Sequence, residues 1–227
     1  RLRRLQAASS VETITELCTT RLPNKMHIPP EDIQVLSPTR KGELGTVNLN
    51  RHLQAALNPP AKDKPEKAFG DVIFRKGDRV MQIKNNYQIE WEIRTKFGLC
   101  VDKGMGIFNG DTGIIEEIND FAETMTISFD EGRKVEYPFK LLEELELAYA
   151  VTIHKSQGSE YPAVVIPLLS GPRMLMNRNL LYTALTRAKE LVVLVGSREA
   201  LKKMTENNKE SKRNSGLCRR IKELAII

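Results

Sequence analysis

The most distinctive pattern in the chain is a polar segment between two apolar runs, within residues 149–168. Apolar runs of this length between turn signals predict buried strands of a parallel sheet. The polar segment holds Thr152 and residues 154–160 and includes a glycine. Open α/β sheets bind their ligands at such a connection after a strand. Because buried polar groups are costly, the pattern favours a binding site over an ordinary polar loop.

The chain before residue 68 alternates between helical and strand patterns. A capping box predicts a helix over residues 9–21, which is expected to stop before Pro23. Residues 32–37 predict a short buried strand, followed by a polar, glycine-bearing turn with two basic side chains. Leucines at helical spacing predict a second helix over residues 49–57, and the charged residues 61–67 predict a linker.

From residue 69 onward, short apolar runs alternate with glycine-bearing turns. Short strands about 8–12 residues apart are typical of a small antiparallel barrel. Residues 130–133 predict a hairpin turn inside it. The strand before this turn, residues 125–129, alternates apolar and polar positions and leads into the hairpin glycine. Its Asp-Glu ending is therefore a poor match to the acidic, metal-binding strand of an ATPase.

After residue 144 the α/β pattern returns. An amphipathic helix is predicted over residues 179–189, an apolar strand over residues 191–196, and a helix capped by Ser197 after it. The fold class is therefore α/β. The predicted division is residues 1–68, an inserted β module at 69–143, and residues 144–227. Since the two outer parts are each too short for a stable core, we expect them to form one domain with the barrel looped out.

The composition, 41% apolar and 28% charged residues, describes a soluble globular protein. No apolar run approaches the roughly 18 residues that span a bilayer, and the basic start lacks the apolar core of a signal peptide. No membrane partner is therefore expected. Three cysteines without a C-x-x-C pair support neither a zinc site nor a disulfide framework, and they indicate a reducing cytoplasm. The chain begins without methionine, as a fragment would.

The net charge is +6, and the last 27 residues hold eight Lys or Arg against three Glu. A basic balance favours nucleic acid or another polyanion as a partner. For the basic tail taken alone, a solvated segment without a partner explains the charge equally well.

Taken together, these segments resemble the C-terminal half of a RecD-like superfamily 1 DNA helicase, of the exodeoxyribonuclease V alpha-subunit family. The resemblance covers nearly the whole chain and follows the family's motifs in order. Residues 152–161 resemble motif V, residues 182–189 resemble motif VI, and residues 35–42 resemble the motif IV region. Patterns at residues 77–82 and 109–113 are similar to the SH3-like insertion of this group.

The resemblance implies a RecA-like (P-loop NTPase type) second motor domain with an inserted SH3-like β-barrel. In this family, two RecA-like lobes bind ATP and Mg²⁺ in the cleft between them and step along single-stranded DNA in the 5′-to-3′ direction. The sequence holds no G-x-x-x-x-G-K-[ST] phosphate-binding loop. We therefore expect the phosphate cradle and the metal ligands in an N-terminal RecA-like domain of the same parent chain. This chain alone is expected to hydrolyse no ATP.

The resemblance also implies which residues face the nucleotide. Arg187 matches an arginine finger, whose guanidinium neutralises charge that develops on the transferred phosphoryl group. Arg40 is a second catalytic candidate, as a phosphate-sensing cation, and Lys41 stays open for the same role. The ATP-binding candidates of motif V are Gln157, Gly158 and Glu160.

The DNA-binding candidates of motif V are Thr152, His154 and Lys155. Because a translocating motor must ignore sequence, we expect these contacts to reach mainly the phosphate backbone. His154 has an alternative role, since a lone histidine often satisfies local hydrogen bonds. Lys84 and Tyr87 are further candidates in the insertion, whereas Trp91 fits a core position better.

An alternative function is a non-catalytic adaptor, in which the barrel binds protein or nucleic acid on an α/β scaffold, because SH3-like barrels serve many roles. An adaptor gives no reason for Arg187, Gln157 and Glu160 to occur together. A nuclease is disfavoured, because no cluster of Asp, Glu and Lys has metal-ligand spacing, and no metal site is expected. The expected partners are single-stranded DNA, the N-terminal RecA-like domain and other subunits of a recombination complex.

Overall fold

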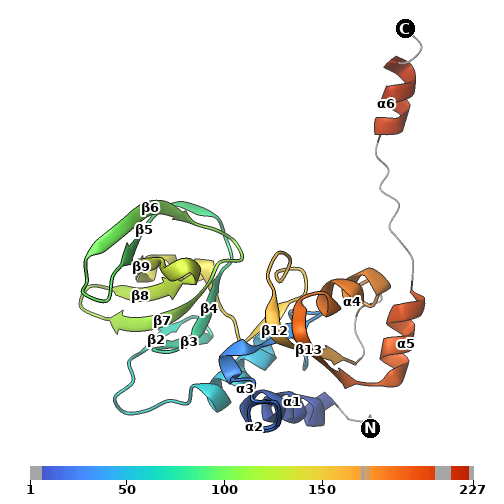
Figure 1. Ribbon diagram of the computed structural model, residues 1–227, viewed down its shortest axis with the longest axis horizontal. Helices are drawn as coiled ribbons and strands as arrows, with labels where there is room; N and C mark the ends of the chain where they lie inside the picture. The colour runs from blue at the N-terminus through green and yellow to red at the C-terminus, as the bar shows by residue number, and fades with distance from the viewer. Residues whose placement is uncertain (1–6, 170–171, 173, 208–215, 225–227) are drawn as a thin grey trace.

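A four-stranded parallel sheet forms the centre of the α/β part of the computed structural model, which describes residues 7–169, 172, 174–207 and 216–224 (Figure 1). Its strand order is β11-β1-β12-β13. The strands are β1 (Ile33–Ser37), β11 (Ala150–Thr152), β12 (Tyr161–Leu168) and β13 (Ala188–Gly196). Strand β1 pairs with β11 on one side, Val35 opposite Ala150, and with β12 on the other, Ile33 opposite Ala163. Residues from before and after the insertion therefore share one sheet.

Helices cover both faces of this sheet. Because alternate residues of a strand point to opposite faces, each strand contributes side chains to both helix layers. The helices are α1 (Ala7–Glu16), α3 (Thr46–Leu57), α4 (Arg178–Leu185) and α5 (Arg198–Glu206). One face packs against α1 and α3 through Val35, Ala163 and Val165. The other face packs against α4 and α5 through Leu36, Val164 and Ile166. Both faces of β12 are thus buried, which explains its nearly unbroken apolar sequence.

The first helix differs from the prediction at both ends. α1 begins at Ala7, so Ser9 lies inside the helix and the predicted capping box does not open it. The helix also continues past Arg21, through a π-helical turn (Leu17–Arg21) into α2 (Leu22–Met26). The predicted stop before Pro23 is therefore wrong. Pro23 lies in the first turn of α2, where its missing N–H costs little.

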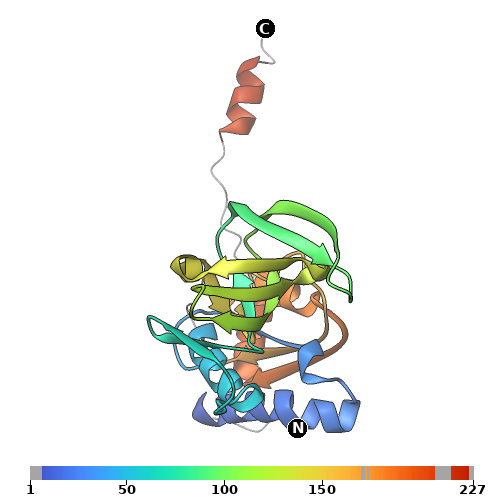
Figure 2. The same cartoon turned by 90° about the vertical axis from the view of Figure 1, so that its left-hand side faces the viewer.

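The insertion folds into a seven-stranded antiparallel sheet with the order β10-β4-β7-β8-β9-β5-β6. Its strands are β4 (Arg79–Gln82), β5 (Asn86–Arg94), β6 (Cys100–Ile107), β7 (Thr112–Asn119), β8 (Thr124–Phe129), β9 (Lys134–Pro138) and β10 (Leu145–Leu147). Figure 2 shows the curled sheet from the side. Its buried residues include Ile115, Ile127 and Tyr137. Within the described residues, β6 and β10 pair with one neighbour each, so main-chain pairing does not close the barrel.

Shorter elements connect these parts. Strands β2 (Glu66–Phe69) and β3 (Val72–Arg75) form a hairpin, so the predicted linker is wrong for its last two residues, which belong to β2. The predicted hairpin turn is confirmed: a 3₁₀ turn (Asp130–Gly132) joins β8 to β9, with positive φ at Glu131 and Gly132. Two further 3₁₀ turns are η2 (Pro30–Asp32) and η4 (Phe139–Glu144), and α6 (Leu217–Leu224) follows α5 along the chain.

Parts of two sequence predictions fall outside the described residues. These are the basic start and much of the basic tail, at residues 1–6, 208–215 and 225–227. The domain boundaries stay a prediction, although the strands of the curled sheet extend from Arg79 to Leu147.

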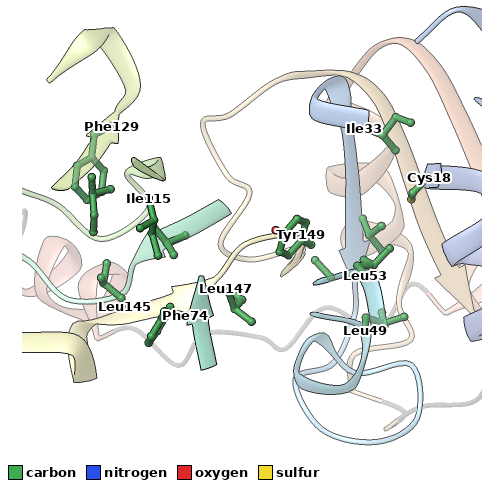
Figure 3. Packing of buried hydrophobic residues seen from close by; sticks show 14 of the residues in the cluster. Cys18, Ile33, Leu49, Leu53, Phe74, Ile115, Phe129, Leu145, Leu147 and Tyr149 are labelled. Atoms are coloured by element: carbon green, nitrogen blue, oxygen red, sulfur yellow. The ribbon is translucent and has the colours of Figure 1, made fainter. Parts of the chain in front are cut away.

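A continuous buried cluster joins the curled sheet to the α/β part. Figure 3 shows Phe74 and Leu147 on the side of the insertion, Tyr149 between the two parts, and Leu53 on the side of the parallel sheet. Leu147 ends β10 and Ala150 begins β11, so only two residues separate the sheets. The two sheets therefore share apolar packing as well as a short covalent connection.

The carboxylate of Asp78 lies at this junction and is fully buried. Its Oδ1 accepts hydrogen bonds from Asn58 Nδ2 at 2.6 Å and from the Tyr149 hydroxyl at 2.9 Å. Its Oδ2 accepts from Gln54 Nε2 at 2.6 Å and from the backbone N–H of Arg75 at 2.7 Å. Burial raises the pKa of Asp78 above its ordinary value, and these four donors oppose the increase. One side chain thus ties together α3, the insertion and the residue before β11.

Replacing Asp78 with Asn should destabilise the fold. Asparagine keeps one acceptor oxygen and replaces the other with an NH₂ group. This NH₂ group would face two of the four donors and leave them without an acceptor. We expect the free energy of unfolding to fall by about 2 kcal/mol or more, as measured by urea denaturation. Asp120→Asn, at an exposed ion pair with Lys67, should change it by less than about 0.5 kcal/mol. Equal effects of the two substitutions would contradict the role of the junction.

Cys18 should resist alkylation in the folded protein. Its side chain is buried in the core, and burial raises the pKa of its thiol to about 12. Since the thiolate is the reactive form, Cys18 should react far more slowly than the exposed Cys100. Iodoacetamide at pH 8, followed by peptide mass spectrometry, should label Cys100 in native protein and Cys18 only in denaturant. Labelling of both at similar rates would show that the π-helical turn Leu17–Arg21 opens readily.

Candidate functional site

The polar segment crosses from one strand of the parallel sheet to another, because β11 and β12 lie on opposite sides of β1. It is a compact turn rather than an extended loop. Ser156 is buried, and its hydroxyl donates to the carbonyl of Ile153 at 2.8 Å. Gly158 has a φ of +91°, in the region that glycine adopts without penalty. The side chains of His154, Gln157 and Glu160 are exposed around this turn.

The segment also spans the depth of the sheet. Thr152 lies opposite Ser37, at the carboxyl end of β1, whereas Tyr161 pairs with Ala188 at the amino ends of β12 and β13. Six residues of β12 separate these levels, which corresponds to roughly 20 Å at about 3.3 Å per residue. The predicted site residues therefore fall into two groups, at different edges of the sheet.

The first group surrounds Arg187 at the amino edge. Arg187 Nη1 donates to the carbonyl of Ser159 at 3.1 Å, and its own carbonyl accepts from the N–H of Tyr161 at 2.8 Å. Its Nε is buried and forms no hydrogen bond with any described residue. Glu160 forms an ion pair with Lys189 at 3.4 Å, with both side chains more than half exposed. The structure thus brings the ends of the predicted motif V and motif VI segments together.

Arg187 does not lie on a helix, so the helix predicted over residues 179–189 is wrong at its end. α4 ends at Leu185, where the N–H of Thr186 bonds to the carbonyl of Tyr182. Residues 188–190 belong to β13 instead, because this strand pairs with β12 from Ala188 onward. Strand pairing overrides the helical pattern of the sequence here, and Arg187 occupies the tight turn between α4 and β13.

Tyr161 is a member of this group that the sequence pattern did not reveal. Burial raises the pKa of its hydroxyl, while nearby Ser159, Arg79 and Arg187 lower it. Arg79 comes from the insertion and is half-buried, donating to the carbonyl of Ile33 at 3.2 Å and to Gln34 Oε1 at 3.1 Å. An arginine of the insertion therefore lies behind the amino edge of the parallel sheet.

The second group lies beside β11, the edge strand of the sheet. Glu146 Oε1 lies 2.5 Å from Arg40 Nη2, and Glu146 Oε2 accepts a hydrogen bond from Lys155 Nζ at 2.9 Å. These three side chains, with Thr46 and Thr152, line a hollow of about 190 Å³. Its apolar floor consists of Met81, Leu147, Ala150 and Val151. Glu146 was missed by the sequence prediction because it ends an ordinary-looking acidic run.

The loop between β1 and α3 holds Arg40 in place. The N–H groups of Thr46 and Val47 bond back to the carbonyls of Thr39 and Arg40. A Cβ at Gly45 would lie 2.5 Å from the carbonyl oxygen of Arg40, so only glycine fits this turn. The structure thus groups Arg40 with Lys155 and Thr152, and not with Arg187. Lys41 is exposed on the same loop.

The candidates in the insertion lie beyond the end of β4. Lys84 forms an ion pair with Glu143 at 2.6 Å. Tyr87 is 67% exposed and packs edge-to-face on Phe108, with ring centroids 5.6 Å apart. Trp91 is half-buried, and it packs against the core and so closely over Gly104 that a Cβ there would lie 2.4 Å from its ring. Tyr87 is therefore available to a ligand, whereas Trp91 is largely committed to packing.

Two further features of the described residues bear on function. They contain no group of three or more His, Cys, Asp or Glu side chains that could hold a metal ion. None of the helices among them is long and apolar enough to span a membrane.

Two family models match parts of this chain. Residues 49–129 match the model of the ATP-dependent RecD-like DNA helicase SH3 domain, and residues 147–195 match that of the UvrD-like helicase C-terminal domain. The second match contains both the polar segment and Arg187.

Curated relatives agree with these matches. The chain is 37% identical over 193 residues to the ATP-dependent RecD2 DNA helicase of Deinococcus radiodurans, covering 85% of this chain and 24% of that protein. It is 34% identical over 199 residues to the RecBCD enzyme subunit RecD of Mycolicibacterium smegmatis, covering 86% and 30%. The chain therefore spans 24% to 30% of the length of these two relatives.

Among solved structures, Bacteroides Pif1 bound to single-stranded DNA aligns with a TM-score of 0.48 at 17% identity, over 77% of this chain and 43% of that one. By its two family matches and its RecD relatives, the chain belongs to the RecD-like group of superfamily 1 helicases.

Proposed function

We propose that the chain is the C-terminal motor half of an ATP-dependent DNA helicase that moves 5′ to 3′ along single-stranded DNA. The observation that carries this proposal is the hydrogen bond from the Tyr161 N–H to the Arg187 carbonyl. It joins the segment that resembles motif V to the one that resembles motif VI. A nucleotide bound there could therefore be sensed by both segments at once.

On the nucleotide side, Arg187 is the proposed arginine finger. Its guanidinium is positioned by Nη1, which donates to the Ser159 carbonyl, and by Nη2, which donates to the Thr186 hydroxyl, while the buried Nε forms no hydrogen bond with any described residue. Gly158, Glu160 and Gln157 are the proposed nucleotide contacts of the neighbouring turn. A Cβ at Gly158 would meet no other atom within 4 Å, so the backbone there is accessible to a phosphate or a ribose.

ATP and Mg²⁺ are the implied cofactors. Basic and backbone donors of the amino-edge group suit the phosphates of ATP, which supplies the energy of translocation. The described residues contain no group of three or more His, Cys, Asp or Glu side chains that could hold a metal ion. We therefore assign the metal ligands and the phosphate cradle to an N-terminal RecA-like domain of the parent protein, and we expect this chain alone to be inactive as an ATPase.

On the DNA side, Thr152, His154 and Lys155 are the proposed backbone contacts, with Lys84 and Tyr87 of the insertion. The contacts of Arg40 with Glu146 and its proximity to Lys155 favour a DNA phosphate as its ligand. Lys41, exposed on the same loop, stays the alternative phosphate-sensing cation that the family resemblance implies. We place the parent protein in the cytoplasm, and a recombination complex is a candidate assembly because relatives include RecBCD subunits.

Loss of Arg187 should abolish most hydrolysis. With the chain mixed with the N-terminal domain of its parent and single-stranded DNA, we expect Arg187→Ala to lower DNA-stimulated ATPase activity by roughly 10³-fold. Arg198→Ala, an exposed arginine at the start of α5, is the matched control and should leave the rate unchanged. Full DNA-stimulated ATPase activity in Arg187→Ala would show that Arg187 is not the arginine finger. Association of the two parts without any hydrolysis would favour the adaptor function.

Tyr87 should contribute to DNA binding by stacking on a base. We expect Tyr87→Ala to weaken binding of a fluorescent oligo(dT) by about 1–3 kcal/mol, measured by fluorescence anisotropy. Phe121, another exposed aromatic residue of the insertion, is the control, and Phe121→Ala should leave binding unchanged. An equal loss in both variants, or none in Tyr87→Ala, would exclude Tyr87 from the DNA track.

A further inference from the structure

The side chain of Glu146 connects the two loops that carry Arg40 and Lys155. Arg40 follows β1, Lys155 follows β11, and Glu146 lies in β10, where it pairs with Met81 of the insertion. One carboxylate of the curled sheet therefore holds two cations of the parallel sheet. Among the described residues, no other charged side chain lines the hollow between them.

The two contacts of this carboxylate differ in kind. Lys155 donates a hydrogen bond to Oε2, and both side chains in this pair are about 70% buried, with 29% and 27% of their surfaces exposed. Oε1 is buried and lies against Arg40, yet it receives no hydrogen bond from any described residue. The Arg40 side chain is 63% exposed, so this contact is a weakly held ion pair.

A phosphodiester matches this carboxylate in charge and in chemistry. Each carries one negative charge and presents oxygen acceptors to the same donors. With Glu146 in place, the hollow holds two cations and one anion; with the carboxylate displaced, both cations are unneutralised. A volume of about 190 Å³ is several times the roughly 30 Å³ that a water molecule occupies. The hollow thus has room for a phosphate group.

We propose that Glu146 competes with the DNA backbone for Arg40 and Lys155, so that its carboxylate limits the affinity for single-stranded DNA. This inference rests on the proposed DNA-binding function. Binding of a phosphodiester frees Glu146 from both cations. Because Glu146 belongs to β10, DNA binding also breaks a direct link between the insertion and the two loops. The carboxylate makes DNA binding weaker, and it keeps the site from holding the strand too tightly to move.

The isosteric substitution Glu146→Gln tests this competition in the 227-residue chain. Binding of fluorescent oligo(dT) is measured by anisotropy between 50 and 200 mM salt. We expect tighter binding at the low-salt end, and a slope of log K against log salt that is steeper by about 0.7 to 1.4. That range corresponds to one or two additional cation–phosphate contacts on a single strand. In Lys155→Ala/Glu146→Gln and Arg40→Ala/Glu146→Gln, most of this gain should disappear.

Two control variants separate competition from other effects. Glu116→Gln removes the same charge from a similar ion pair, with Lys134 at 2.6 Å, elsewhere in the curled sheet, and should leave the slope unchanged. Glu146→Asp keeps the charge while altering the packing, and it should keep the wild-type slope. Thermal unfolding of each variant shows whether the fold is intact.

Weaker or unchanged DNA binding in a folded Glu146→Gln variant would overturn the inference, because Glu146 would then be a structural brace. An equal gain in Glu116→Gln would also overturn it, since the effect would reflect net charge alone. Failure of the DNA-binding function itself gives a different result. In that case the wild-type chain does not bind oligo(dT), or Lys155→Ala and Arg40→Ala bind as the wild type does.

Discussion

The buried carboxylate of Asp78 is the constraint on which the rest of this structure depends. It accepts four hydrogen bonds from α3, from the insertion and from Tyr149, at the point where the chain passes from one sheet into the other. An uncompensated charge in this position would be prohibitive, whereas a fully bonded one fixes the relative orientation of the groups around it. Tyr149 lies one residue before β11. The position of the edge strand, and of Lys155 after it, therefore depends on the same junction.

From that junction, the parallel sheet distributes the candidate residues between two edges. Arg187 and Glu160 lie at the amino edge, whereas Lys155 and Arg40 lie beside β11. A single turn, residues 153–160, connects the two groups. This turn is compact and holds the buried Ser156. We therefore expect a displacement of residues at one end of the turn to move the residues at the other end as well. This arrangement suits a motor half in which nucleotide and DNA are bound at separate places and must affect one another.

Sequence patterns predicted the elements whose environment is uniform along their length. β12 is buried on both faces, and its nearly unbroken apolar sequence predicted a buried strand there. The turn at residues 130–132 needs positive φ at two positions, and its Glu-Gly pair marked a hairpin. Ser197 caps α5 by accepting from the N–H of Ala200, as its sequence position predicted.

The remaining features depend on contacts between distant residues, which local patterns do not encode. α4 ends early because Ala188 pairs with Tyr161, 27 residues before it. Helical structure continues past Pro23, because the π-helical turn Leu17–Arg21 leads directly into α2. Pro23 then lies in the first turn of α2, where a proline is tolerated. Glu146 could not be distinguished from its acidic neighbours, since its significance comes from Arg40, more than 100 residues earlier.

Hydrogen exchange over residues 153–160 and 186–187 in the assembled parent protein tests the two-edge arrangement most directly. A non-hydrolysable ATP analogue alone should protect residues 157–160 and the turn that holds Arg187. Single-stranded DNA alone should protect residues 153–156, and both ligands together should protect the whole segment. Unchanged exchange in these residues with either ligand, while other parts of the protein respond, would contradict a role for this segment in coupling nucleotide to DNA.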